Sequence, residues 1–254
     1  MLLVIDVGNT SITFGVFNND NLISSFNFKT NKKSNTEQFS LNLAKKFSEN
    51  SIDPSLINAS IISSVVPELK VVIAATIKNI TGLEPIEVSH SSKTNMSILY
   101  DNPKEVGADR IVNSVAAYSI FKTSTIVVDF GTATTFDCIS AEGAYLGGAI
   151  APGIKISSDA LTLSASKLPR VDIEKPRNII GKNTAESMQA GIFYGYVSLV
   201  DGLIRCLKKS MQTDPVVIST GGYSKIISDE SELIKHCDEF LTLKGLQILF
   251  KLNG

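Results

Sequence analysis

The first 30 residues place apolar and polar positions in short alternating blocks, which predicts three strands joined by turns. Leu2–Ile5 is apolar throughout, as in a buried strand, and the alternation over residues 12–16 is typical of a half-buried one. Asp6–Thr10 lies between them and contains Gly and Asn, which tolerate positive φ and favour a turn. Leu22–Phe28 is the third predicted strand.

A helical pattern follows these strands. Ser34 and Glu37 have the spacing of a capping box, and Phe39, Leu43 and Phe47 recur on one helical face behind them. The later expected elements are a strand at 59–66, a helix to about residue 81, a strand near 85–88, an irregular segment over 91–105 and a helix from residue 110.

The second half of the chain repeats the order of the first. Residues 126–128 form an apolar strand, Asp129-Phe-Gly131-Thr132 a turn, and residues 135–139 and 144–149 two further strands. Two matched copies of strand, D-x-G-[NT] turn, strand, turn and strand predict an α/β protein with two related lobes. Each lobe would be a mixed sheet flanked by helices, and we place the lobes at residues 1–110 and 111–254.

A long helix is expected at about residues 185–210, and it contains three glycines. Gly191, Gly195 and Gly202 each cost about 1 kcal/mol inside a helix. We therefore expect another backbone to approach this helix closely.

Composition excludes several classes of protein. The 254 residues include 43% hydrophobic residues, which is ample for a packed core, and a net charge of −1, which predicts neither nucleic acid nor an anionic membrane as partner. The 3 cysteines are odd in number, so they cannot all be paired within one chain, and a reducing, cytoplasmic location is expected. The 2 histidines leave few ligands for a zinc site. We find no signal peptide, and no apolar stretch approaches the ~20 residues of a membrane span.

The two acidic turns are candidates for phosphate chemistry. A glycine at a bend lets backbone N–H groups approach phosphate oxygens, and an acid at the end of the preceding strand can hold a cation. Each turn alone could be an ordinary Asp–Gly hairpin, whereas both together in matched contexts favour a shared function. The rival phosphate motifs GxxxxGK[ST] and GxGxxG are missing.

Four further segments contain candidate site residues. Asp109 in Gly107–Arg110 is either the N-cap of the following helix or a proton acceptor for a substrate hydroxyl. Asn183-Thr184 starts a helix, and Tyr100 is a partly buried aromatic unless a ligand lies there. Thr220–Gly222 after a strand is weak evidence for a nucleotide-base surface.

Strings typical of one family run across nearly the whole chain. They are Asp6–Thr10 (DVGNT), Ser63–Pro67 (SSVVP), Gly107–Arg110 (GADR), Asp129–Thr135 (DFGTATT), Gly147–Gly153 (GGAIAPG), Gly181–Thr184 (GKNT) and Thr220–Gly222 (TGG). With these strings the chain resembles the type III pantothenate kinases. The turns mark only the superfamily, whereas GADR joined to the two strings after it is much more specific. The resemblance assigns no role to residues 236–254.

The resemblance implies an acetate-and-sugar-kinase/Hsp70/actin-like fold with two ribonuclease H-like lobes, and a homodimer. It implies that ATP phosphorylates pantothenate to 4′-phosphopantothenate, the first step of coenzyme A biosynthesis. Mg²⁺ and a monovalent cation, K⁺ or NH₄⁺, would be required.

The residue roles are also implied by the resemblance. ATP would contact Asp6, Val7, Gly8, Asn9, Thr10, Ser11, Ile12, Thr13 and Thr132. Pantothenate would contact Tyr100, Gly107, Ala108, Asp109 and Arg110, with Thr184 supplied by the partner subunit. Asp109 would accept the proton of the primary alcohol, and Asp129 would hold the monovalent cation.

Two alternatives remain at this point. Another small-molecule kinase of the same fold is the nearest, although the zinc-binding cysteine cluster of repressor-like sugar kinases has no counterpart in 3 scattered cysteines. A non-catalytic nucleotide-binding regulator would be expected to have lost Asp6, Asp109 or Asp129, and all three are present.

Overall fold

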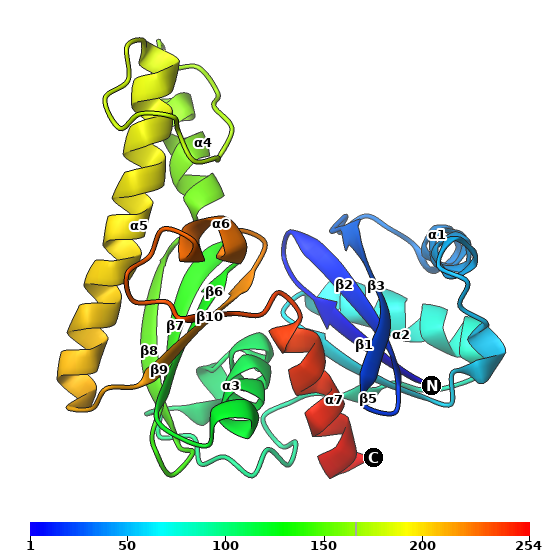
Figure 1. Cartoon of the computed structure of the whole chain (residues 1–254). Helices are drawn as coiled ribbons and strands as arrows, with labels where there is room; N and C mark the ends of the chain where they lie inside the picture. Colours follow the sequence, from blue (N-terminus) through cyan, green and yellow to red (C-terminus); the bar gives the residue numbers. More distant parts are fainter. Residues whose placement is uncertain (166) are drawn as a thin grey trace. The chain divides into compact units, whose positions relative to one another are not determined.

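The computed structural model describes residues 1–165 and 167–254 (Figure 1). Its contacts group the chain into two compact units. Unit 1 comprises Met1–Met96, Asp101–Ala116 and Leu241–Gly254, and unit 2 comprises Ser97–Tyr100 and Ala117–Phe240. The lobe boundary at residue 110 stays a prediction. The contacts also group the last 14 residues with the N-terminal segment, which the predicted boundary does not include.

Unit 1 is built on a five-stranded sheet in the order β3-β2-β1-β4-β5. The central strand β1 (Leu2–Val7) runs antiparallel to β2 (Ser11–Asn18), which pairs in turn with β3 (Asn21–Lys29). On the other side, β4 (Ala59–Ser64) and β5 (Ile86–Glu87) are parallel to β1. The strands expected in this part of the sequence are confirmed.

One face of this sheet is covered by α1 (Thr36–Glu49) and α2 (Pro67–Thr81), and their apolar residues form one core with the odd-numbered residues of β1. The helix expected after residue 34 is confirmed, but its cap is shifted by one residue. The N-cap is Asn35, whose side chain accepts a hydrogen bond from the Gln38 N–H at 2.9 Å. Asn competes well with Ser at this position, so the spacing of Ser34 and Glu37 was misleading.

The other face of the sheet is covered by α7 (Leu241–Asn253), which lies beside α3 (Ala108–Phe121). An added Cβ at Gly15 of β2 would lie 2.9 Å from Leu243, and one at Gly245 would lie 2.3 Å from the Val112 carbonyl oxygen. Two short 3₁₀ helices, Pro54–Leu56 and Pro103–Glu105, lie in the connections. The last helix of the sequence is therefore an integral part of the N-terminal sheet's packing.

Unit 2 repeats the sheet of unit 1, with the order β8-β7-β6-β9-β10. Its central strand β6 (Thr125–Phe130) pairs antiparallel with β7 (Ala133–Ile139) and parallel with β9 (Val216–Gly221). The outer strands are β8 (Tyr145–Pro152) and β10 (His236–Cys237). Taken in chain order within each unit, the strands occupy identical places, so the predicted duplication is confirmed.

The long helix α5 (Thr184–Met211) matches the helix expected at 185–210, and its Phe193, Val200 and Ile204 pack on the sheet of unit 2. Figure 1 shows α5 continuing beyond the sheet, with α4 (Ile154–Ser164) beside that end. The short helix α6 (Ser224–Ser228) follows β9.

In one respect α5 corrects the sequence analysis. It is the one helix in the described part of the chain with the length and composition of a membrane span. Core helices of other proteins meet the same criteria, so this is weak evidence. Within the described residues, 39% of its most apolar stretch is buried.

Candidate active site

The first acidic turn joins β1 to β2 in unit 1. Asp6 is the penultimate residue of β1, and Asn9 and Thr10 lie at the exposed bend. The Gly8 N–H closes the turn by donating to the Ser11 carbonyl oxygen at 2.9 Å. Thr30 stabilises this turn with two hydrogen bonds. Its hydroxyl donates to the Gly8 carbonyl oxygen at 2.7 Å, and its N–H donates to the Thr10 carbonyl oxygen at 3.0 Å. The bend is thus held open toward solvent by fixed backbone hydrogen bonds.

The second acidic turn joins β6 to β7 in unit 2 and is one residue shorter. The Gly131 N–H donates to the Ala133 carbonyl oxygen at 3.1 Å, and Thr132 is exposed at the bend. The carboxylate of Asp129 lies against the end of β9, where an added Cβ at Gly221 would be 2.6 Å from its Oδ1 atom. Gly221 also has φ +91, so both its conformation and its lack of a side chain make room for Asp129.

Both acids are flanked by hydroxyl residues on the neighbouring strands. Asp6 pairs in register with Thr13 of β2 and Ser63 of β4. Asp129 pairs with Thr135 of β7 and Thr220 of β9. Since partners in register lie on the same face of a sheet, each carboxylate has a hydroxyl on either side. Sequence reasoning missed this, because the positions become equivalent only once the parallel pairing is known.

Two of these hydroxyls are buried without a hydrogen bond. Ser63 is 0% exposed and Thr220 1%, and within the described residues no partner reaches the Ser63 Oγ or the Thr220 Oγ1. Such groups are rare in folded proteins because each leaves a desolvated dipole uncompensated. Their occurrence at equivalent places in the two units marks both strand ends as polar sites.

Gly107–Arg110 forms the start of α3. The helix begins at Ala108, so Asp109 lies in its first turn and the N-cap interpretation of Asp109 is wrong. The Asp109 carboxylate folds back, accepting a hydrogen bond from the Arg110 N–H at 2.8 Å, and an added Cβ at Gly107 would meet its Oδ1 at 2.5 Å. Gly107 is therefore the residue that leaves room for this acid.

The environment of Asp109 favours its protonated form. Burial raises the pKa of the Asp109 carboxyl, and the hydrogen bond from the Arg110 N–H and the charge of the Arg110 guanidinium oppose that rise. A raised pKa makes a carboxylate a better proton acceptor, and perturbed pKa values are frequent at functional sites.

The other predicted residues lie in unit 2. Tyr100 is partly buried and groups with β8, although the residues on both sides of Ser97–Tyr100 belong to unit 1. Thr184 is exposed at the start of α5, directly after the N-cap Asn183, whose side chain accepts from the Glu186 N–H at 3.0 Å. The helix start predicted at Asn183-Thr184 is confirmed. Within unit 2 the structure therefore places Asp129, Thr132, Tyr100 and Thr184, and within unit 1 the Asp6 turn and Gly107–Arg110.

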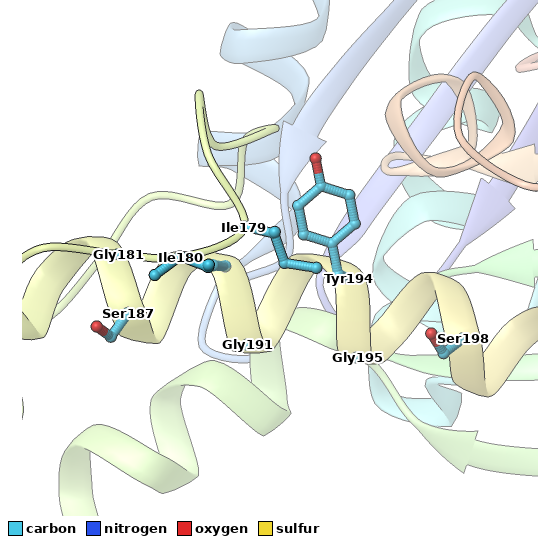
Figure 2. Close-up of a pocket in the computed structure, with 9 residues that line it drawn as sticks. Ile179, Ile180, Gly181, Ser187, Gly191, Tyr194, Gly195 and Ser198 are labelled. Carbon is cyan, nitrogen blue, oxygen red and sulfur yellow. The ribbon is translucent and has the colours of Figure 1, made fainter.

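A shallow pocket of about 600 Å³ lies on α5 and contains none of the predicted site residues (Figure 2). Small residues of one face of α5 form its floor, and the segment before the helix borders it. The lining residues are Ile179, Ile180, Gly181, Ser187, Ala190, Gly191, Tyr194, Gly195 and Ser198.

The two duplicated units, each with an acid near the end of its central strand and a glycine turn after it, have the fold of the sugar kinases and actin-like ATPases. Solved structures agree on the fold. The chain is similar to a conserved Campylobacter jejuni protein assigned to the Baf family of transcriptional activators, with a TM-score of 0.61, 19% identity and coverage of 98% and 97% of the two chains. It is also similar to an ROK hexokinase from Thermus thermophilus, with a TM-score of 0.50, 14% identity and 98% and 97% coverage.

Sequence comparison identifies the family. The model of the type III pantothenate kinases matches residues 2–206. A type III pantothenate kinase of Geotalea daltonii is 51% identical over 253 residues, which cover 100% of this chain and 99% of the relative. The chain belongs to the type III pantothenate kinase family.

Proposed function

We infer that this protein transfers the γ-phosphoryl group of ATP to the primary alcohol of pantothenate, giving ADP and 4′-phosphopantothenate. The observation that carries this inference is full-length membership of the family with Asp6, Asp109 and Asp129 all present. The product is the first intermediate of coenzyme A biosynthesis, and we expect the reaction in the cytoplasm, consistent with three free cysteines.

We assign ATP binding to the Asp6–Thr13 turn and to Thr132. The exposed, hydrogen-bonded bend after β1 supports this assignment, because fixed backbone N–H groups beside a phosphate need no reorganisation during the reaction. In the transfer, the alcohol oxygen bonds to the γ-phosphorus while the bond from the γ-phosphorus to the bridging oxygen breaks.

Asp109 orients the attacking alcohol in this proposal. The transition state of phosphoryl transfer is loose, so alignment of the hydroxyl precedes transfer of its proton to the carboxylate. The raised pKa of Asp109 supports this role, and the neighbouring Arg110 supplies positive charge. Tyr100, Gly107 and Ala108 complete the assigned pantothenate contacts.

The cations have different expected binding modes. In the described residues no group of three or more His, Cys, Asp or Glu side chains could hold a metal ion. Mg²⁺ then fits best as an ion carried by the ATP phosphates with one protein carboxylate at most, which is its usual mode in kinases. Asp129 with hydroxyl residues on both sides is an oxygen donor set that suits a monovalent cation, K⁺ or NH₄⁺.

A coupled ADP-release assay tests the function. We expect ADP release that depends on pantothenate and is increased by K⁺ over Na⁺. ATP hydrolysis that ignores pantothenate, or phosphorylation of a sugar in its place, would overturn the proposal. The non-catalytic alternative predicts ATP binding without turnover.

A homodimer through α5 is part of the same proposal. Ser187, Gly191, Gly195 and Ser198 follow helical spacing along one face, and an added Cβ at Gly191, Gly195 or Gly202 would meet nothing within 4 Å (Figure 2). Ile179 and Ile180 beside this face are 65% and 70% exposed. Within the described residues the glycines thus serve no close approach, and a second copy packed on this face would supply it and bring its Thr184 to the neighbour's site.

Light scattering at micromolar concentration tests the dimer, and Gly195→Leu tests the face. Leucine favours a helix over glycine by about 1 kcal/mol, so this variant should fold while blocking close approach. Ala44→Leu, at an exposed position of α1, is the matched control. A monomeric wild type would refute the dimer, and an unchanged dimer in Gly195→Leu would refute this interface.

A further inference from the structure

Tyr145, at the start of β8, fixes the segment that carries Tyr100. The Tyr145 N–H donates to the Ser97 carbonyl oxygen, and the Leu99 N–H donates to the Tyr145 carbonyl oxygen, both at 2.8 Å. Ile98 and Tyr145 form an isolated parallel bridge. These bonds attach Ser97–Tyr100 to unit 2, while the residues before and after them belong to unit 1.

The side chain of Tyr100 lies on the same part of β8. Its ring centroid is 6.3 Å from that of Tyr145, at an interplanar angle of 51°. An added Cβ at Gly147 would lie 3.5 Å from the Cδ2 and Cε2 atoms of the Tyr100 ring, and Gly147 has φ +108. Tyr145 and a bare stretch of backbone at Gly147 thus support the Tyr100 ring, whose remaining surface stays partly exposed.

The Tyr145 ring is itself held by a buried acid. Asp137 of β7 is 0% exposed, as is Tyr145. The Tyr145 hydroxyl donates to the Asp137 Oδ1 at 2.8 Å, and the Thr135 hydroxyl donates to Oδ2 at 3.2 Å. A hydrogen bond to a buried carboxylate is stronger and more directional than one between neutral groups, so it fixes the plane and depth of the tyrosine ring.

Stability alone is a poor reason for this arrangement. A buried carboxylate is costly to desolvate, and apolar residues of similar volume often serve a core as well. Polar pairs of this kind contribute a defined orientation instead. The proposed reaction makes no use of Asp137, so its orienting effect on Tyr145 calls for a different role.

We propose that Asp137 and Tyr145 are positioning residues that hold Tyr100 in the orientation in which it contacts pantothenate, with Gly147 leaving the space for its ring. This inference rests on the proposed role of Tyr100 in substrate binding. Neither Asp137 nor Tyr145 touches substrate in it. Their effect is expected on pantothenate rather than on ATP, because the ATP contacts are assigned to the Asp6–Thr13 turn and to Thr132.

Tyr145→Phe is the main test, because it removes the hydroxyl and keeps the ring. We expect KM for pantothenate to rise about 3- to 30-fold, the effect of one charge-assisted hydrogen bond acting through orientation. KM for ATP should stay within about twofold. Asp137→Asn keeps an acceptor for the tyrosine and should have a smaller effect. Tyr118→Phe, which removes a hydroxyl bonded to the exposed Ala141 carbonyl at 3.3 Å, is the matched control.

A second readout does not depend on turnover. The chain has 6 tyrosines, so labelling with 3-fluorotyrosine gives a ¹⁹F spectrum in which Tyr100→Phe assigns the Tyr100 signal. In Tyr145→Phe we expect the Tyr100 signal of the substrate-free protein to shift and broaden, whereas Tyr118→Phe should leave it in place. If Tyr145→Phe does not fold, the combined Asp137→Asn and Tyr145→Phe variant removes the buried charge together with its donor and takes its place.

The outcomes separate this inference from the function on which it rests. If Tyr100→Ala leaves KM for pantothenate unchanged, the assigned role of Tyr100 is wrong. If Tyr100→Ala raises that KM but Tyr145→Phe alters neither the KM nor the Tyr100 signal, the positioning role is wrong and the function stands. Equal rises in both KM values would show a general structural effect and would also overturn the positioning role.

Discussion

Replacement of Asp109 by Asn separates the chemical role of this acid from its place in the fold. Asn has the same shape, and its Oδ1 can keep the hydrogen bond from the Arg110 N–H, now 2.8 Å long. Gly107, which has no Cβ, leaves the space for the side chain in either form. The change therefore removes the negative charge and the proton acceptor with little movement of atoms.

The expected loss in kcat is at least about 10²-fold, because positioned acid–base groups contribute about 10² to 10⁴. That corresponds to about 2.7 kcal/mol or more of transition-state stabilisation. KM for ATP should stay within about twofold, since ATP is assigned to other residues. In the wild type, kcat/KM for pantothenate should fall with decreasing pH through a pKa above the ordinary 3.8 of an aspartate.

The stability of the same variant should change in the opposite sense. Folded Asp109 has a raised pKa, so it binds a proton more tightly than the unfolded chain does. Its stabilising contribution is complete below pH 3.8 and is lost as the pH rises through the folded pKa. Asn does not ionise and avoids this loss. At pH 7 the melting temperature of the variant should equal or exceed that of the wild type, and the difference between the two melting temperatures should disappear at acidic pH.

Thermal melts between pH 4 and 8, beside the ADP-release assay, measure both effects. Near-normal turnover in Asp109→Asn would refute the catalytic role. A variant that is inactive and also markedly less stable at pH 7 would show that the carboxylate serves the fold.

Two further predictions concern the end of β9. Thr220→Val removes a buried hydroxyl that has no bonded partner in the described structure, so the free energy of unfolding, measured by denaturant titration, should rise by about 1 kcal/mol. Thr134→Val is the control, because it loses a hydrogen bond to the Tyr196 hydroxyl and should lower the free energy of unfolding. A lower value for Thr220→Val would contradict the view that this hydroxyl is uncompensated. Gly221→Ala forces a side chain into a φ of +91 and against Asp129. The left-handed conformation alone costs about 1–2 kcal/mol, so the free energy of unfolding should fall by more than that, and activation by K⁺ should weaken. Gly82→Ala, with φ +74 and nothing within 4 Å of the added Cβ, is its control, and equal losses in both would refute the contact argument.

Much of the fold could be predicted from local patterns. The strands around Asp6 and Asp129 are short, strongly periodic and bounded by glycine turns, so their identity and their duplication followed from the sequence. The α5 helix was also predicted, although Gly191, Gly195 and Gly202 lie within it. These are signals in which neighbouring residues determine the structure.

Features that depend on distant pairing could not be predicted. Nothing in the sequence shows that Ser63 and Thr220 are equivalent, because the register of two parallel strands creates that relation. The Tyr145–Asp137 bond joins two strands across a turn, and Tyr145 meets Tyr100 only because the Ser97–Tyr100 segment, distant in the sequence, pairs with the start of β8. Asp109 was ambiguous because a cap and a first-turn acid differ by two positions, which is the usual uncertainty at a helix end.

The packing of α7 also has a consequence for the order in which the chain acquires its structure. During synthesis β1, β2 and β4 leave the ribosome first, but the face of their sheet that α7 covers waits until Leu241–Asn253 has been made. Unit 2, apart from the Ser97–Tyr100 segment, is continuous from Ala117 to Phe240 and can form in the meantime. The first strands made are thus among the last to be fully enclosed. A chain that stops before Leu241 would expose Val4 and Gly15 of the sheet that carries the Asp6 turn, although every residue of that turn would be present.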